Sequence, residues 1–129
     1  MRSLARETVF KFLYSQLFNP SDEGLFTVLA KELNDDDKSF AQNLIKIINE
    51  NESEFLDKIS QLSVGYKLNR IFATDKCALL IGMAELKGYP ETAVAVVIDE
   101  SVKLAAKYST EKSTDFVNGI LAEYAKEIR

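Results

Sequence analysis

Residues 73–86 read ATDKCALLIGMAEL and are apolar on almost every side. A surface helix carries a single apolar stripe, whereas a helix that is apolar all round lies buried. Thr74 is expected to cap this helix, and Asp75 would lie in its first turn, where the helix dipole favours a carboxylate. The stretch therefore predicts the central and most buried helix of the fold, running from Asp75 to about Leu86.

Apolar residues recur at helical spacing on both sides of this centre. They predict helices over residues 3–18, 23–33, 38–49 and 52–60, a short helical turn over 68–72, and helices over 91–108 and 114–128. Ser3 and Ser113 are the expected N-caps of the first and last helices, and Asn34 with the three aspartates 35–37 is expected to form an acidic cap for the helix that follows them. The predicted fold is all-α, a single-domain bundle of about seven helices over residues 1–129.

Composition excludes several classes of protein. The chain has no histidine and one cysteine, Cys77, so the usual zinc sites and a histidine-dependent catalytic triad are excluded. It has no glycine-rich phosphate loop, no apolar run near the roughly 20 residues of a membrane span, and no signal-peptide pattern. Catalysis by carboxylates alone stays open, although no pair stands out. We expect a cytoplasmic protein without metal, cofactor or catalytic residues, in which Cys77 is a buried hydrophobe.

The formal net charge of −4 is unevenly distributed. Residues 1–18 carry three basic and one acidic side chain, residues 19–66 carry four basic and ten acidic, and residues 67–129 carry nine of each. A protein that is acidic overall is a poor non-specific nucleic-acid binder. A basic N-terminus on an acidic body can still hold RNA in one place, above all with the help of a partner.

Residues 113–121 read STDFVNGIL and place Asn118 and Gly119 inside a predicted helix. Asn-Gly is typical of turns, and glycine within a helix costs about 1 kcal/mol relative to alanine. Such a pair is expected either where the backbone of another element packs closely against this helix, or where a side chain must reach a binding partner. We favour close helix packing with a satisfied amide.

Three segments in this order resemble the NusB family of bacterial transcription antitermination factors. They are RSLARE at 2–7 followed by FLY at 12–14, ATDKCALLIGMAEL at 73–86, and VIDESVKLA at 97–105 joined to FVNG at 116–119. The chain departs from the family at Asp99, where asparagine is usual, and at Ala122, where aspartate is common. Its N-terminal arm also has fewer arginines than that of many members.

The resemblance implies a NusB-like fold and a binding function without catalysis. NusB-like proteins pair with the small-subunit ribosomal protein NusE, bind the boxA element of nascent RNA and help RNA polymerase through terminators, notably in ribosomal RNA operons. The implied partners are therefore boxA RNA, NusE and the RNA polymerase antitermination complex. A helical interaction module or homodimer without RNA binding is the alternative. An RNA cytosine methyltransferase, to which NusB-like domains are sometimes fused, is disfavoured because 129 residues leave no room for its catalytic domain.

Seven side chains are predicted to bind RNA under this resemblance. Guanidinium groups bind phosphate in a bidentate way, and a helix N-terminus beside a lysine and an aromatic ring can hold a phosphate or stack a base. The predicted residues are Arg2, Arg6, Lys11, Lys112, Ser113, Phe116 and Asn118. The alternatives are a solvated helix start for the arginines, an ordinary cap for Ser113 and core packing for Phe116.

Tyr14, Asp75 and Glu85 are predicted to contact the protein partner. Tyrosine is favoured at interfaces because its ring is apolar and its hydroxyl polar, and an acidic face suits a basic ribosomal protein. A role in the helix dipole is the alternative for Asp75. Glu100 is expected to tie its own helix to the one that carries Asn118.

Overall fold

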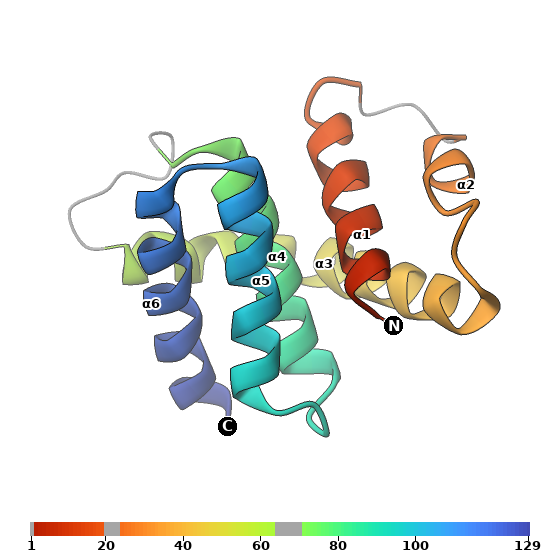
Figure 1. The fold of residues 1–129 in the computed structure, drawn as a ribbon. Helices are drawn as coiled ribbons and strands as arrows, with labels where there is room; N and C mark the ends of the chain where they lie inside the picture. Colours follow the sequence, from red (N-terminus) through yellow and green to blue (C-terminus); the bar gives the residue numbers. More distant parts are fainter. Residues whose placement is uncertain (1, 20–23, 64–70) are drawn as a thin grey trace.

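The computed structural model describes residues 2–19, 24–63 and 71–129, and within these ranges every regular element is an α-helix. The helices are α1 (Arg2–Gln16), α2 (Leu25–Leu29), α3 (Asp35–Leu62), α4 (Ala73–Gly88), α5 (Val94–Tyr108) and α6 (Glu111–Ile128). Figure 1 shows α4, α5 and α6 side by side, with the long α3 crossing behind them toward α1 and α2. The predicted all-α fold is confirmed. No helix in the described ranges is long and apolar enough to cross a membrane.

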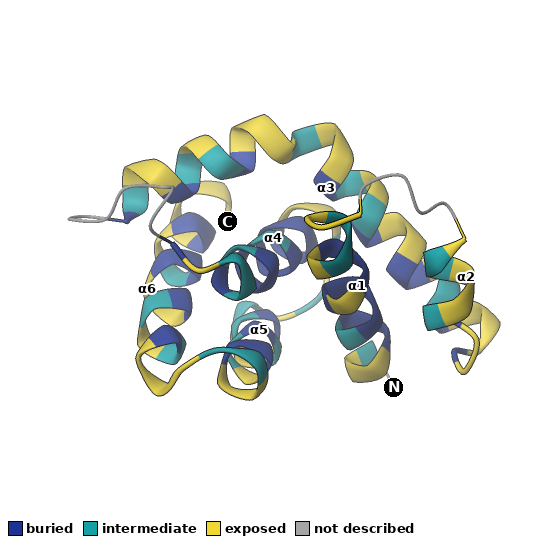
Figure 2. Ribbon diagram, turned by 90° about the horizontal axis from the view of Figure 1, so that it is seen from above, coloured by how far each residue is buried: buried dark blue, intermediate teal, exposed yellow. Residues whose placement is uncertain are grey.

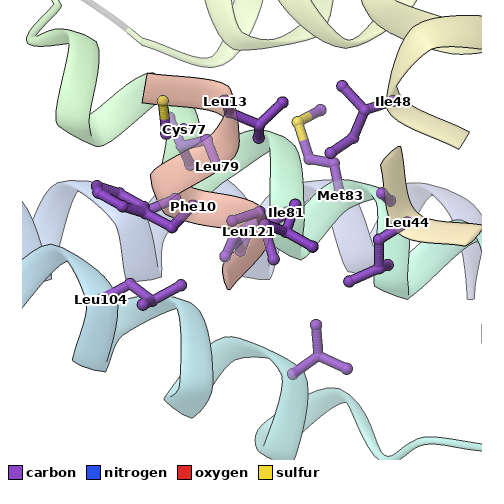
Figure 3. Close-up of a cluster of buried hydrophobic side chains, with 14 of the residues drawn as sticks. Phe10, Leu13, Leu44, Ile48, Cys77, Leu79, Ile81, Met83, Leu104 and Leu121 are labelled. Carbon is purple, nitrogen blue, oxygen red and sulfur yellow. The ribbon is translucent and has the colours of Figure 1, made fainter. Parts of the chain in front are cut away.

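The central position predicted for residues 73–86 is confirmed. In Figure 2, α4 is almost entirely buried and is surrounded by α1, α3, α5 and α6, all of which pack against it. The core around α4 draws side chains from five helices (Figure 3): Phe10, Leu13, Leu44, Ile48, Cys77, Leu79, Ile81, Met83, Leu104 and Leu121. Cys77 is buried as expected, and this burial raises the pKa of its thiol to about 12, so the thiol stays protonated at neutral pH.

Gly82 allows α4 to approach α5 and α6 closely. A Cβ atom at this position would lie 2.6 Å from Leu121 Cδ1 and 2.7 Å from Ser101 Oγ. Both neighbours are buried and have little room to move. Any side chain at residue 82 would therefore push the three helices apart.

The two helices predicted over 38–49 and 52–60 form one continuous helix, α3. The polar residues between them suggested a break, but most of them face solvent, and Asn51 Nδ2 donates to the Ile47 carbonyl within the helix. The predicted cap at residues 34–37 is present: the Asn34 side chain accepts from the Asp37 N–H at 2.8 Å, and the three aspartates lie in the first turn of α3. The described residues therefore hold six helices, and residues 68–70 of the predicted short turn lie outside them.

Three N-caps are predicted at other positions than the structure has them, and within the described residues only α6 has a different side chain as its cap. α6 begins at Glu111, capped by Thr110, whose hydroxyl accepts from the Ser113 N–H. α4 begins at Ala73, before Thr74, without a side-chain cap. α1 begins at Arg2, so Ser3 lies in its first turn. A serine or threonine hydroxyl can hydrogen-bond to several nearby groups. The packing of the surrounding helices decides which of these bonds forms.

Candidate nucleic-acid interface

A pocket of about 590 Å³ lies where the N-terminal ends of α4 and α6 meet. We call it the helix-start pocket. It is lined by Ile71, Phe72, Asp75, Thr110, Glu111, Lys112, Ser113 and Phe116. The first turn of a helix presents N–H groups that have no partner within the helix, and these groups favour anions. Three of the predicted RNA-binding residues, Lys112, Ser113 and Phe116, thus share one pocket.

The buried hydroxyl of Ser113 and the buried carboxylate of Asp75 are hydrogen-bonded to each other in the lining of this pocket. Ser113 Oγ donates to Asp75 Oδ2 at 2.9 Å and lies 2.9 Å from the Ser109 hydroxyl and 3.1 Å from that of Thr110. Asp75 is only 5% exposed, and its second oxygen, Oδ1, has no hydrogen-bond partner. Buried polar atoms are nearly always satisfied, so Oδ1 is an exception: a buried acceptor without a donor, in a residue that lines the pocket.

The opposite side of the pocket is aromatic and cationic. Phe72 is 58% exposed although it lies directly before the buried α4. Phe116 is half-buried and packs against the core, so its predicted alternatives, core residue and RNA contact, are compatible with each other. Lys112 is exposed at the rim. Aromatic rings beside a cation suit the bases and phosphates of single-stranded RNA.

Arg6 and Glu85 lie inside the protein and bind each other. Arg6 Nε donates to Glu85 Oε1 at 2.7 Å and Nη2 donates to Oε2 at 2.6 Å, and the residues are 5% and 1% exposed. We call these contacts the buried ion pair. Burial disfavours the Arg6 charge, but the hydrogen bonds and negative charge of Glu85 outweigh this effect, so the Arg6 pKa is raised. The buried ion pair joins α1 to α4. In this position neither side chain reaches the surface where the predicted RNA and protein contacts would be made.

Glu100 belongs to the same cluster, which corrects the expectation that it binds the helix of Asn118. Its carboxylate lies 3.6 Å from Arg6 Nη1 and accepts a hydrogen bond from the Ser3 hydroxyl at 2.8 Å. Glu100 therefore joins α5 to α1. The bonded partners in this cluster are 79 to 97 positions apart in the chain, and sequence periodicity carries no information on such pairs.

The other basic residues of the N-terminus do not form a continuous patch. Arg2 is half-buried, with Cζ 4.3 Å from the centre of the Phe40 ring and 5.3 Å from that of Tyr89. Such cation–π contacts hold the guanidinium against α3 and the turn after α4. Lys11 is half exposed and lies 3.8 Å from Glu7 on its own helix. Of Arg2, Arg6 and Lys11, Lys11 is the most accessible to a phosphate group.

Asn118 lies outside the helix-start pocket. It lines a separate groove between α5 and α6, and both Asn118 and Gly119 are exposed. No atom of another part of the protein would lie within 4 Å of a Cβ at Gly119. The predicted close packing at this pair is therefore wrong. The close approach occurs at Gly82, which the sequence signals only as a glycine within an otherwise apolar run.

Tyr14 lies at the surface within a row of aromatic rings. Its ring centre is 6.4 Å from that of Phe10 and 5.2 Å from that of Phe18, and Phe10 stacks on Tyr108 of α5 at 4.6 Å. We call these four residues the aromatic ridge. Tyr14 is 37% and Phe18 71% exposed, and Leu17 beside them is also exposed. Exposed aromatic and aliphatic side chains that cluster in this way are typical of protein interfaces.

Comparison with known proteins places this structure among close relatives. The NusB family model matches residues 3–126. Proteins named "Transcription antitermination protein NusB" from Methylacidiphilum infernorum (isolate V4) and Koribacter versatilis (strain Ellin345) are 35% and 32% identical. The alignments cover 98% of this chain and 91% and 87% of those proteins.

Solved structures give the same result. T. maritima NusB superimposes with a TM-score of 0.91 at 32% identity, over 98% of this chain and 92% of that one. A structure described as antitermination factors NusB and NusE in complex with dsRNA superimposes with a TM-score of 0.85 at 28% identity, over 98% and 96% of the two chains.

Proposed function

This chain belongs to the NusB family, and we propose that it is a transcription antitermination factor that binds boxA RNA together with NusE. The family match extends over nearly the whole chain, and a structurally similar NusB has been solved with NusE and double-stranded RNA. The proposed function is binding within the RNA polymerase antitermination complex, and it requires no chemical step from this protein.

The helix-start pocket is the observation that carries the RNA-binding part of the proposal. Lys112 and the N–H groups at the start of α6 can bind phosphate, while Phe72 and Phe116 offer surfaces on which an unpaired base can stack. Lys11 and Arg2 supply weaker contacts to the RNA backbone, and Arg6 acts indirectly by holding α1 in place.

The aromatic ridge is the proposed surface for NusE. Tyr14, Leu17 and Phe18 offer it exposed apolar area, which a protein partner can cover. The ridge ends at Tyr108, two residues before Thr110, which lines the helix-start pocket. A protein bound to the ridge would therefore lie beside RNA bound in the pocket, and contacts between the two would explain why the partner increases RNA affinity.

A gel-shift titration with boxA RNA tests the proposal. We expect weak binding by this chain alone and tight binding once NusE is added, and no gain on adding NusE would refute the joint function. Lys112→Ala should reduce the slope of log affinity against log salt by roughly 0.7, the value expected for one contact with single-stranded RNA. Lys46→Ala, at an exposed lysine of α3 outside the pocket, is the matched control and should leave the slope unchanged.

A further inference from the structure

The groove between α5 and α6 shares no lining residue with the helix-start pocket and none with the aromatic ridge. We call it the α5–α6 groove. Its volume is about 690 Å³, and it is lined by Val94, Ala95, Ile98, Asp99, Val102, Thr114, Asp115 and Asn118. The groove is thus built from residues other than those of the proposed RNA and NusE sites.

The two walls of this groove differ in chemistry. α5 contributes aliphatic side chains at the spacing of one helix face, and α6 contributes polar ones. Both walls carry an acid, Asp99 on α5 and Asp115 on α6, and no lysine or arginine lines the groove. Lys103 lies 3.0 Å from Asp99, but both side chains are more than 60% exposed, so this pair contributes little and exchanges readily with other cations.

Gly119 adjoins the groove, one helical turn after Asp115. The two mid-helix glycines in the described part of the chain, Gly82 and Gly119, differ sharply in their surroundings. Gly82 has buried neighbours within 3 Å of where a side chain would begin, whereas Gly119 has open space. A glycine here costs α6 about 1 kcal/mol relative to alanine, and no contact within the described structure offsets that cost. Its lack of a side chain leaves the α6 backbone accessible to an external molecule, and Asn118 beside it offers an amide.

We propose that the α5–α6 groove docks a segment of a partner protein that carries aliphatic side chains next to lysine or arginine. Aliphatic side chains would cover the α5 wall, and the basic groups would meet Asp99 and Asp115. The same acids repel phosphate, so RNA does not suit this surface. Close approach at Gly119 lets the segment lie against the α6 backbone. The groove is thus a second protein-binding surface, distinct from the aromatic ridge.

Titration of the ¹⁵N-labelled full chain with short defined peptides tests this proposal by NMR. The probe is an amidated peptide with leucine and lysine at helical spacing, and the matched peptide has glutamate in place of lysine. We expect saturable shifts of the amides of Ile98, Val102, Asn118 and Gly119 with the lysine peptide only. Equal binding of the glutamate peptide would overturn the proposal, as would shifts confined to the helix-start pocket or the aromatic ridge.

Substitutions inside and outside the groove distinguish peptide binding in the groove from a general effect of charge on peptide binding. Asp99→Lys combined with Asp115→Lys should weaken the lysine peptide about tenfold or more, while Asp57→Lys on the exposed side of α3 should not. Gly119→Gln adds a side chain in open space, so it should leave the fold intact and weaken the peptide several-fold. Lys112→Ala should leave peptide binding unchanged whether or not it affects boxA RNA.

Two further results would contradict the proposal. Concentration-dependent shifts of the groove amides without any peptide would indicate that a second copy of this chain occupies the groove. Shifts of the same amides on adding boxA RNA alone would assign the groove to RNA.

Discussion

Two carboxylates on α4 are almost equally buried and differ in how they are satisfied. Both oxygens of Glu85 accept hydrogen bonds from Arg6, whereas only one oxygen of Asp75 has a donor, Ser113. The first site is closed and stabilises the contact between α1 and α4. The second leaves Oδ1 without a donor in a residue that lines the helix-start pocket, and we call this pocket the open site. An acid on a buried helix can thus serve the fold or a ligand, and the satisfaction of its second oxygen distinguishes the two.

Substitution at the closed site, the buried ion pair, should cause the largest loss in the free energy of unfolding. Arg6→Ala leaves Glu85 buried without a countercharge, and we expect the free energy of unfolding to fall by about 3–5 kcal/mol. Urea denaturation monitored by circular dichroism measures this change. Lys11→Ala, at an exposed residue of the same helix, should stay within about 0.5 kcal/mol of the parent. Similar losses for the two variants would show that the buried ion pair does not hold α1 in place.

Gly82 and Gly119 form a second pair of contrasting positions, because Gly82 is crowded by its neighbours and Gly119 has open space around it. Gly82→Ala places a methyl group against Leu121 and Ser101, and we expect a loss of about 1–3 kcal/mol in the free energy of unfolding. Gly119→Ala meets no neighbour and should raise stability by up to about 1 kcal/mol through better helix propensity. Thermal unfolding of both variants measures the difference. A loss of stability in Gly119→Ala would contradict the open space around Gly119 in the structure.

The open site should respond in binding and not in stability. Phe72→Ala removes an exposed ring from the helix-start pocket, and we expect boxA affinity in the presence of NusE to fall by about 1–3 kcal/mol, the usual effect of losing one base–aromatic stack. Fluorescence anisotropy with labelled RNA provides the measurement. Val28→Ala on α2 removes an equally exposed apolar side chain away from the pocket and should have no effect. If Phe72→Ala leaves the affinity for boxA RNA unchanged, the RNA bases do not stack on Phe72.

The smallest effect is expected at an exposed ion pair between α1 and α5. Hydrogen bonding from Lys107 lowers the pKa of Glu7, so this contact stabilises the fold above the unfolded-state pKa of about 4.3 and is lost as pH falls through the lower folded-state value. Glu7→Gln should therefore flatten the loss of stability on acidification. Urea titrations at several pH values measure the slope. Glu50→Gln, at an exposed glutamate of α3, is the control, and equal slopes for both variants would contradict the assignment.

Much of the fold could be predicted from the sequence, and less of the site. The positions of Lys112 and Ser113 at the start of the last helix follow from local signals, and the structure places both in one pocket. Phe72 carries no such signal, because an exposed phenylalanine before a buried helix looks like part of the core. Arg129 likewise gives no hint that its guanidinium donates to the carbonyls of Leu86, in the last turn of α4, and of Tyr89 and Thr92 after that helix.

The sequence by itself determined the helices, the burial of α4 and the family. These follow from apolar spacing and short motifs, which act over a few residues of chain. Only the tertiary structure decided which charges are buried, which carboxylate oxygen lacks a donor and which glycine is crowded. Those outcomes depend on side chains far apart in sequence, such as Arg6 and Glu85 at a separation of 79 residues, whose meeting is set by the packing of whole helices.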